Sequence, residues 1–319
     1  MHIDVMCVGE MVIDFTPGKE KGSYIRNAGG APANVAIAIS RFGRSSAFCG
    51  KLGNDDFGRF LLQTLQEDNV RILCHALSDE AVTTMAFVTL NEEGERSFTF
   101  ARKPGADMLL KPADIMEHDV NNSTIIHTGS CSLSCGTARE ATKHVMQLGH
   151  KKGKLVSFDL NYRELLWADE KDAICQVKCV LPYVDLLKVS EEEAFLIGGE
   201  RQIPNLMREC GISVTVVTHG SKGACAYFNG QTLQIAAREA KVADTNGAGD
   251  AFWGGFLSSL LDQGVVSADE LYDKAIWDAM QFGTAAGWLT VQKHGAIPAL
   301  PYKAQVENVI KNRVNQHEK

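Results

Sequence analysis

The sequence predicts an α/β protein built on a doubly wound, mostly parallel sheet, with a small antiparallel β sheet standing off it. Two observations lead to this fold class. Short apolar runs alternate with amphipathic stretches along most of the 319 residues, which is typical of buried parallel strands connected by helices. Nearer the N-terminus, two pairs of segments alternate polar and apolar residues around short turns. No internal repeat or linker divides the chain, so we expect a single domain over residues 1–319.

Six apolar runs are expected to form the parallel strands of the main sheet. They span residues 3–9, 46–50, 125–129, 155–159, 186–189 and 214–218. A helix is indicated over residues 57–65, where apolar side chains recur at helical spacing after the start signal Asp55 and Asp56. Ligands of open α/β sheets bind beyond the carboxyl ends of the strands, so functional residues are expected at that edge.

Two hairpins are predicted for the smaller sheet. Residues 83–90 and 96–101 alternate with period two on either side of a turn at 91–94. Residues 11–15 and 23–27 flank a second turn that contains glycine. Together they predict a small antiparallel sheet formed by about residues 11–28 and 83–102. The alternative is two separate surface hairpins.

The composition indicates a globular protein without a nucleic-acid or membrane partner. Apolar residues make up 45% of the chain and charged residues 22%, enough for a large core. A net charge of −7 and a pI near 5.7 argue against binding to nucleic acid or to an anionic membrane. The N-terminus shows no signal peptide, and no apolar run approaches the roughly 20 residues of a membrane span.

The nine cysteines are scattered and do not form a metal-binding pattern. The close pairs are Cys131 with Cys135 and Cys175 with Cys179, and neither has the Cys-x2-Cys spacing of a zinc site. They are expected to be reduced, mostly buried thiols, which indicates a cytoplasmic protein.

Residues 244–252 carry the strongest functional signal. The small residues Gly247, Ala248 and Gly249 allow a sharp turn with bare N–H groups, directly before a helix-compatible run. Such a helix start attracts anions, because its orphan N–H groups and its macrodipole point at the ligand. Asp250 follows where these donors converge, so the segment is suited to moving a phosphoryl group onto an alcohol with Asp250 as the base. The alternative is an ordinary helix start in which Asp250 complements the dipole.

A second motif occupies residues 29–43. Gly29 and Gly30 permit a close approach of the backbone to a ligand. Pro32 suits the first turn of a helix that Gly43 would end. Asn34 is a lone amide at the helix start and offers both a donor and an acceptor, as a polyol ligand requires. Alternatively, Asn34 satisfies local backbone groups.

Together these segments resemble the two signatures of the ribokinase-like (PfkB) carbohydrate kinases. The first covers residues 29–36 and the second residues 244–257, and the resemblance extends over nearly the whole chain, including 50–58 and 295–301. Within the family the chain is most similar to bacterial fructokinases, on residues 9–15 and 158–167. The resemblance implies an ATP-dependent sugar kinase that uses Mg²⁺, with a K⁺ site also implied. It further implies that the small sheet is a lid over the sugar and the interface of a homodimer.

The resemblance also implies a set of sugar-binding residues. Asp14, Gly30 and Asn34 match family positions that hold sugar hydroxyls, and a carboxylate at position 14 can accept two adjacent hydroxyls. From the lid, Phe100 or Arg102 is expected to cover the ring.

Two further segments at predicted strand ends are implied to contact sugar, phosphate and metal. Asn161 and Arg163 resemble the fructokinase pattern that reaches sugar and phosphate; the alternative is a local Asp159–Arg163 pair on a loop. Ser190 and Glu193 lie where the family places Asn-x-x-Glu, with Glu193 acting on Mg²⁺ through metal-bound water. An acidic helix start is the alternative for Glu193.

The remaining implied contacts are with the nucleotide and with K⁺. The turn after the last predicted parallel strand matches the family's contacts to nucleotide phosphate and ribose, and a stretch rich in small residues follows the catalytic helix as the wall of the adenine slot. These nucleotide positions are Thr218, Gly220, Gly223 and Ala286. Asp244 and Thr245, with the loop at Gly295, match the monovalent cation site.

The predicted function is therefore ATP-dependent phosphorylation of D-fructose to fructose 6-phosphate. A P-loop kinase is excluded because no Gly-x4-Gly-Lys-Ser/Thr motif occurs. The alternatives are 2-keto-3-deoxygluconate kinase, ribokinase or a riboside kinase of the same fold, and a catalytically inactive sugar-binding regulator.

Overall fold

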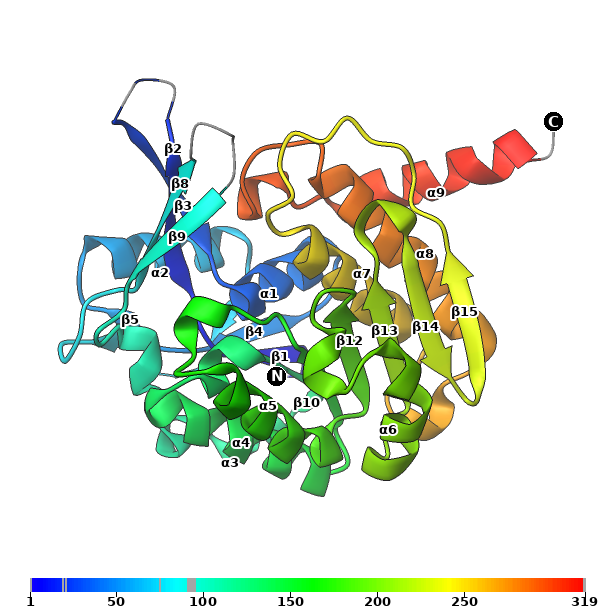
Figure 1. The fold of residues 1–319 in the computed structure, drawn as a ribbon, viewed down its shortest axis with the longest axis horizontal. Helices are drawn as coiled ribbons and strands as arrows, with labels where there is room; N and C mark the ends of the chain where they lie inside the picture. Colours follow the sequence, from blue (N-terminus) through cyan, green and yellow to red (C-terminus); the bar gives the residue numbers. More distant parts are fainter. Residues whose placement is uncertain (1, 19, 21, 75, 91–95, 318–319) are drawn as a thin grey trace.

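A nine-stranded sheet runs through the middle of the computed structural model, which describes residues 2–18, 20, 22–74, 76–90 and 96–317 (Figure 1). The strand order is β15-β14-β13-β12-β11-β10-β1-β4-β6. The parallel strands are β1 (Ile3–Val8), β4 (Ser46–Cys49), β6 (Arg71–Ile72), β10 (Ser123–Gly129), β11 (Leu155–Asp159), β12 (Leu186–Ser190) and β13 (Val214–Thr218). All six apolar runs of the sequence form parallel strands, so this prediction is confirmed.

Helices cover both faces of the sheet, as a doubly wound fold requires. They are α1 (Ala31–Arg41), α2 (Asp56–Glu67), α3 (Glu117–Asn121), α4 (Gly136–Lys151), α5 (Glu170–Val180), α6 (Ile203–Cys210), α7 (Ala248–Asp262), α8 (Asp273–Thr290) and α9 (Lys303–His317).

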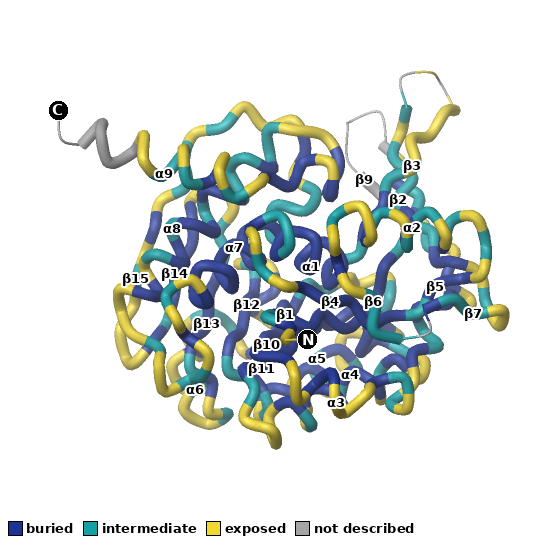
Figure 2. Tube along the Cα trace, turned by 180° about the vertical axis from the view of Figure 1, so that it is seen from behind, coloured by how far each residue is buried: buried dark blue, intermediate teal, exposed yellow. Residues whose placement is uncertain are grey.

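Side chains of alternate residues along each strand enter two different cores. Val5 and Cys7 of β1 pack in the cluster that contains α1, α7 and α8, whereas Met6 and Val8 pack in the cluster that contains α4 and α5. This period of two is the reason why the buried strands appear in the sequence as continuous apolar runs. Figure 2 shows the resulting layers of buried chain at the centre of the molecule.

The small sheet has the strand order β3-β2-β8-β9 and stands off the main body (Figure 1). Its strands are β2 (Val12–Pro17), β3 (Tyr24–Gly29), β8 (Met85–Leu90) and β9 (Arg96–Ala101), close to the predicted ranges of 11–28 and 83–102, with β3 ending one residue later. The turn at 91–94 lies outside the described residues. β2–β3 and β8–β9 are antiparallel hairpins, as predicted.

One pairing within the small sheet differs from the expectation, because β2 and β8 are parallel. Both strands leave the main body in the same direction, and Ile13 N–H donates to Thr84 O over 3.0 Å where they do so. Each returns as the second strand of its own hairpin. The strands that leave the body therefore lie at the centre of the small sheet, and the strands that return to it lie at its edges.

The main sheet also ends in a hairpin that the sequence analysis did not identify. β14 (Ala224–Phe228) pairs antiparallel with β13, and β15 (Gln231–Ile235) pairs antiparallel with β14. Asn229 and Gly230 join them, with φ of 49° and 74°. An Asn-Gly pair between two strand-like runs is a signal for this turn. A short pair, β5 (Leu52–Gly53) with β7 (Leu77–Ser78), completes the strands. Among the helices of the described chain, none combines the length and apolarity needed to cross a membrane.

Candidate active site

The N-terminus of α7 forms a bare, tightly fitted turn at the carboxyl edge of the main sheet. Gly247 adopts φ of 75°, and a Cβ atom placed there would lie 3.0 Å from the Cα atom of Ala296. The helix begins at Ala248, so its first amides have no carbonyl partner within the helix. These donors and the helix dipole make the turn suited to holding a phosphoryl group.

Asp250 lies in the first turn of α7, and only 8% of its surface is exposed. Its Oδ2 accepts a hydrogen bond of 2.7 Å from Asn34 Nδ2 in α1. Asn34 Oδ1 is buried and has no hydrogen-bond partner among the described residues. The two sequence motifs therefore meet, and they leave one amide oxygen without the partner that a ligand hydroxyl could provide.

The contact between Asn34 and Asp250 depends on the close packing of α1 against α7. A Cβ atom on Gly254 of α7 would lie 2.8 Å from Ala38 Cβ in α1. A side chain at 254 would push the helices apart, so this glycine of the 244–257 segment allows the 29–43 segment to lie where Asn34 reaches Asp250.

The charge state of Asp250 reflects opposing influences. Burial raises its pKa above the ordinary value of an aspartate. The Asn34 hydrogen bond and the positive charges of Lys188 and Arg163 oppose that rise, while Glu193 adds to it.

Asp14 approaches the same site from strand β2 of the small sheet. Its carboxylate lies against Gly29, where a side chain would collide with it. Burial raises the pKa of Asp14 to about 6, with Arg163 lowering it and Asp250 and Asp244 raising it. Gly30 has φ of 108°, and a Cβ atom there would lie 2.6 Å from Glu10 O, so only glycine fits.

The two lid candidates occupy different environments. Phe100 pairs with Ala86, which pairs with Asp14 across the small sheet, so Phe100 and Asp14 lie in one row. Arg102 instead is buried, with Nε and Nη2 donating to Asp107 Oδ2 over 2.8 and 2.6 Å and Nη1 donating to Ser134 Oγ over 3.0 Å. The expectation that Arg102 covers the sugar ring is therefore corrected: its guanidinium is committed to anchoring the end of β9 to the body.

The strand end after β11 carries Asn161 and Arg163. Asn161 has φ of 38°, and its carbonyl accepts a hydrogen bond from Cys131 Sγ over 3.4 Å. Arg163 is exposed, but its charge lowers the pKa of both Asp14 and Asp250, so it lies within electrostatic reach of the site. The alternative, a local pair between Asp159 and Arg163, is not found, because Asp159 is bonded to Lys188 instead.

Glu193 fastens two strand ends together. Its Oε1 accepts from Tyr162 N–H over 2.7 Å and its Oε2 from Ser190 N–H over 2.9 Å, while Ser190 Oγ accepts from Glu193 N–H over 3.2 Å. The carboxylate thus holds the turn after β12 against the loop that carries Arg163. The described residues contain no group of three or more His, Cys, Asp or Glu side chains arranged to hold a metal directly.

The residues predicted for the nucleotide lie beyond β12 and β13. Ser190 and Thr218 are paired in register at the ends of these strands. Gly220 and Gly223 adopt φ of 53° and 110°, and a side chain at 223 would collide with the backbone of Ile235. These glycines shape a turn at the carboxyl edge, next to Ser190.

Ala286 requires a correction. It lies in α8, is fully buried, and its Cβ would be 3.3 Å from a Cβ atom on Gly255 of α7. Its side chain therefore packs in the α7–α8 interface and does not line an open slot.

Asp244 connects the turn at the start of α7 with the loop at Gly295. Its Oδ1 accepts from Asn246 N–H and its Oδ2 from Gly295 N–H, both over 3.0 Å. Thr245 is exposed, and its carbonyl accepts from Ala248 N–H over 3.3 Å. The segments expected to form the monovalent cation site are thus adjacent.

Two buried groups of this region were missed from the sequence. Lys188 Nζ donates to both oxygens of Asp159, and Glu10 Oε2 accepts from Ser132 Oγ over 2.9 Å. A lysine inside the apolar run 186–189 was an available signal, because an ion in a buried strand requires a partner.

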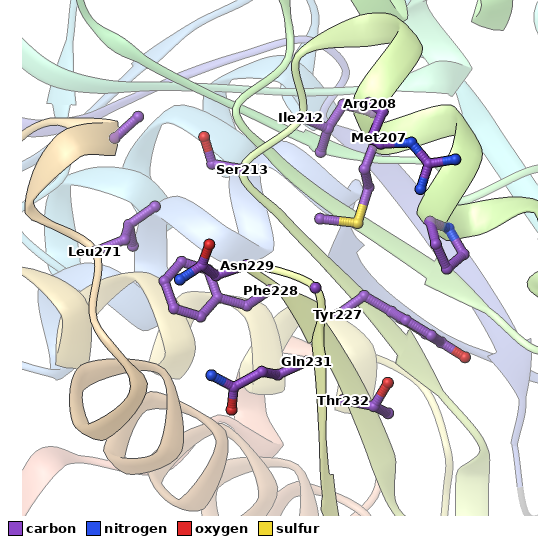
Figure 3. Close-up of a pocket in the computed structure, with 13 residues that line it drawn as sticks. Met207, Arg208, Ile212, Ser213, Tyr227, Phe228, Asn229, Gln231, Thr232 and Leu271 are labelled. Atoms are coloured by element: carbon purple, nitrogen blue, oxygen red, sulfur yellow. The ribbon is translucent and has the colours of Figure 1, made fainter.

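A hollow of about 540 Å³ lies away from these residues (Figure 3). It is lined by residues of α6 and of the β14–β15 hairpin, with Leu271 on another side. Arg208 is the charged side chain among its described lining residues. It contains none of the residues predicted for the site.

Known proteins resemble the chain over its whole length. The pfkB family of carbohydrate kinases matches residues 2–303. Fructokinase-2 of Solanum habrochaites is 36% identical over 317 residues, which cover 96% of each chain. A crystal structure of the fructokinase of Xylella fastidiosa with bound ATP has a TM-score of 0.91 at 30% identity and covers 98% of this chain and 99% of that one. A double mutant of the Vibrio cholerae O395 fructokinase, with fructose, ADP and potassium ion bound, has a TM-score of 0.86 at 34% identity, covering 96% and 97%.

Proposed function

The chain belongs to the pfkB family of carbohydrate kinases, and from this premise we propose that it phosphorylates D-fructose to fructose 6-phosphate with ATP. The observation that carries the proposal is the contact between Asn34 and Asp250 at the bare start of α7. It combines a base, an unpartnered amide acceptor and an anion-binding turn at one point. The fructokinase relatives and the fructose bound in the Vibrio cholerae structure support fructose as the sugar.

In the proposed reaction Asp250 accepts the proton of the primary hydroxyl of the sugar. The hydroxyl oxygen bonds to the γ-phosphorus of ATP while the bond between that phosphorus and the ADP oxygen breaks. The amides at the start of α7 stabilise the charge on the transferred group, chiefly those of Gly247, Gly249 and Asp250, because Ala248 N–H already donates to Thr245 O. Asn34 holds Asp250 through Nδ2, so its free Oδ1 is directed to a hydroxyl of the same sugar.

The lid and the strand ends bind the rest of the substrates in this proposal. Asp14, with Gly30 behind it, accepts sugar hydroxyls, and Phe100 covers the ring from the same row of the small sheet. Asn161 and Arg163 reach sugar and phosphate from the loop after β11.

The nucleotide lies along the ends of β12 and β13 in the same proposal. Ser190, Thr218, Gly220 and Gly223 border it there. Ala286 acts only indirectly, by supporting the position of α7.

The site suits a magnesium ion that arrives with the phosphates. Asp250 raises the pKa of Asp159, Asp159 raises that of Glu193, and Glu193 raises that of Asp250. These three carboxyl groups outnumber the two positive charges of Lys188 and Arg163. Both Glu193 oxygens already accept backbone N–H groups, so contact through metal-bound water fits better than direct ligation. The ion would neutralise charge on the phosphates. Asp244 and Thr245, beside the Gly295 loop, would hold K⁺.

Assembly and location complete the proposal. The single domain of residues 1–319 would form a homodimer through the lid, whose edge strand β3 leaves Tyr24 and Ile25 exposed by 45% and 52%. Light scattering of wild type and of an Ile25→Lys variant would test this, with a monomeric variant expected. A cytoplasmic location is supported by nine cysteines that all carry free thiols.

The substrate is tested by an ATP-consumption assay with Mg²⁺ and K⁺. The panel contains fructose, ribose, 2-keto-3-deoxygluconate, mannose, glucose and a nucleoside. We expect fructose to lead by tenfold or more in kcat/KM, about 1.4 kcal/mol of discrimination. A lead for another sugar would keep the chemistry and replace the substrate. No turnover with any of them would contradict the proposal and favour a sugar-binding regulator.

A further inference from the structure

A buried ion pair lies below the catalytic turn. Lys188 in β12 and Asp159 at the end of β11 are register partners in the main sheet. Lys188 Nζ lies 2.9 and 2.8 Å from the two oxygens of Asp159, and the side chains are only 6% and 1% exposed. Taking both charges out of water costs free energy, and an apolar pair of similar size would fill the same place. The pair therefore calls for an explanation other than stability.

The ammonium group lies directly beside the anion-binding turn. A Cβ atom placed on Gly249 would be 3.3 Å from Lys188 Nζ and 3.6 Å from its Cε. Gly249 thus leaves space into which the lysine reaches, and a full positive charge stands next to the amides that start α7. Such a charge in a buried site acts strongly, because little water screens it.

Groups from several elements face Asp250. They are Asn34 of α1, Asp14 of β2, Asp159 of β11, Arg163 of the following loop, Lys188 of β12 and Glu193 of the turn after β12. The carboxylates disfavour the charge of Asp250, and Lys188 and Arg163 favour it. Arg163 is exposed and Lys188 is not, so the buried lysine supplies the fixed part of the positive charge.

The titratable side chain of β10 next to the pair, His127, is neutral. Burial, and then the charge of Lys188, lower the pKa of His127 in β10 to about 3. His127 Nδ1 lies 3.0 Å from Ser157 Oγ, which also accepts from Trp253 Nε1 of α7 over 2.8 Å. A neutral imidazole cannot replace the lysine as the source of positive charge.

We propose that Lys188 is a positioning residue for phosphoryl transfer: held by Asp159, it keeps a positive charge beneath Gly249 that maintains Asp250 as a carboxylate and favours the phosphoryl group in the turn. The role rests on the proposed function, in which Asp250 is the base. Lys188 gives up no proton in the reaction; the hydroxyl proton goes to Asp250.

The decisive variant removes both charges of the pair. Lys188→Met alone leaves Asp159 buried without its partner and is expected to destabilise the fold, whereas Asp159→Asn with Lys188→Met leaves no unpaired ion. We expect the double variant to melt near wild type. It should nevertheless lose about 10²-fold in kcat, the scale for removing one preorganised charge-stabilising group. The single variant Lys188→Arg retains both Asp159 and the positive charge, so its kcat should lie between those of the double variant and wild type.

The control replaces an exposed pair of the same residue types. Lys274→Met with Asp278→Asn changes a surface contact of α8 and should leave kcat and its pH profile unchanged. In the double variant at the site, the acidic limb of the kcat profile should move up, because the loss of Lys188 eases protonation of Asp250 by more than the loss of Asp159 opposes it. A structural role alone would leave that limb in place.

A carboxyl titration separates this proposal from the proposed function. The Asp250 carboxyl is followed by NMR of protein labelled at the aspartate carboxyl carbons, with Asp250→Asn for assignment and without any substrate. We expect a higher pKa of Asp250 in the double variant than in wild type. An unchanged pKa together with full kcat would overturn the role of Lys188, whether or not fructose is the sugar. Absence of turnover in wild type would contradict only the proposed function.

Discussion

The main body and the small sheet, the proposed lid, contribute residues of different construction to the proposed site. On the body side, Asp250, Lys188 and Asp159 lie on elements covered on both sides, and each of the three residues is less than 9% exposed. On the lid side, Asp14 belongs to a small sheet whose edge strand β3 is largely exposed, as Figure 2 shows. The packed body can therefore keep these three charged groups in fixed positions away from water. Fewer buried contacts fix the position of the small sheet, because much of its edge strand β3 is exposed.

The difference teaches where each kinetic parameter originates. Groups that stabilise the transition state require fixed geometry, so changes in the body are expected to lower kcat. Groups that capture the sugar in the ground state act mainly on KM, so changes in the lid are expected to raise KM. The following predictions test that division, starting with the largest expected effect.

Replacing Asp250 with Asn should lower kcat by about 10²–10⁴-fold with little change in nucleotide affinity, because the general base is lost while the turn stays intact. Steady-state kinetics and calorimetric titration with ADP measure the two quantities. Asp262→Asn, at the opposite end of the same helix and paired with Arg44 and Lys303, is the matched control. Turnover of Asp250→Asn near that of the control would remove the proposed base.

Replacing Gly247 with Ala should lower kcat by about 10²-fold, because the added methyl would meet Ala296 and shift the amides of the turn. Gly264→Ala has nearly the same backbone strain, with φ of 80° against 75°, but nothing within 4 Å of the added Cβ. Both variants should lose about 1–2 kcal/mol of stability from the left-handed conformation. Equal loss of kcat in both would show that strain alone is responsible.

Replacing Asp14 with Asn should raise the KM for the sugar by about tenfold or more and leave kcat within a few-fold, because charge-assisted hydrogen bonds to hydroxyls are weakened. Asp79→Asn, an exposed carboxylate bonded to Asn54, is the control. A large fall in kcat with unchanged KM would assign Asp14 to the chemistry and break the division between lid and body.

The same residue predicts a pH dependence of sugar binding. The pKa of Asp14 is about 6 before the sugar binds, and the ionised carboxylate is the stronger acceptor of hydrogen bonds from sugar hydroxyls. The ionised fraction falls from about nine tenths at pH 7 to about one tenth at pH 5, so KM should rise by roughly tenfold as pH falls through 6. In Asp14→Asn this rise should be absent. Calorimetric titration with the sugar from pH 5 to 8 measures it.

The smallest effect is expected in the aromatic cluster that supports the lid. Phe87 stacks on Phe15 with ring centroids 5.0 Å apart, and its ring is 5.9 Å from that of Tyr24. Phe87→Ala removes these contacts, worth about 0.5–1.5 kcal/mol each beyond buried area. We expect a few-fold rise in KM for the sugar and less than a twofold change in kcat. Tyr272→Ala, exposed and remote from the lid, should change neither.

Much of the architecture was predictable because its signals are local. Each buried parallel strand is a short apolar run in the sequence, and Asp55 caps α2 by accepting from Gly58 N–H over 2.8 Å, as its position before the helix indicated. The β14–β15 turn was missed although the Asn229-Gly230 signal was present. Lys188 was missed because an isolated charge within a strand does not show where it points.

The sequence by itself determined the strands, the two glycine-containing motifs and the family to which they point, since close approach and sharp turns require particular residues at particular positions. Only the tertiary structure decided that Asn34 contacts Asp250 across 216 positions and that Lys188 lies beneath Gly249. It also decided that Arg102 is committed to Asp107 and that β2 pairs with β8 in parallel. These contacts depend on which helices and strands pack together, and no local pattern of residues encodes that choice.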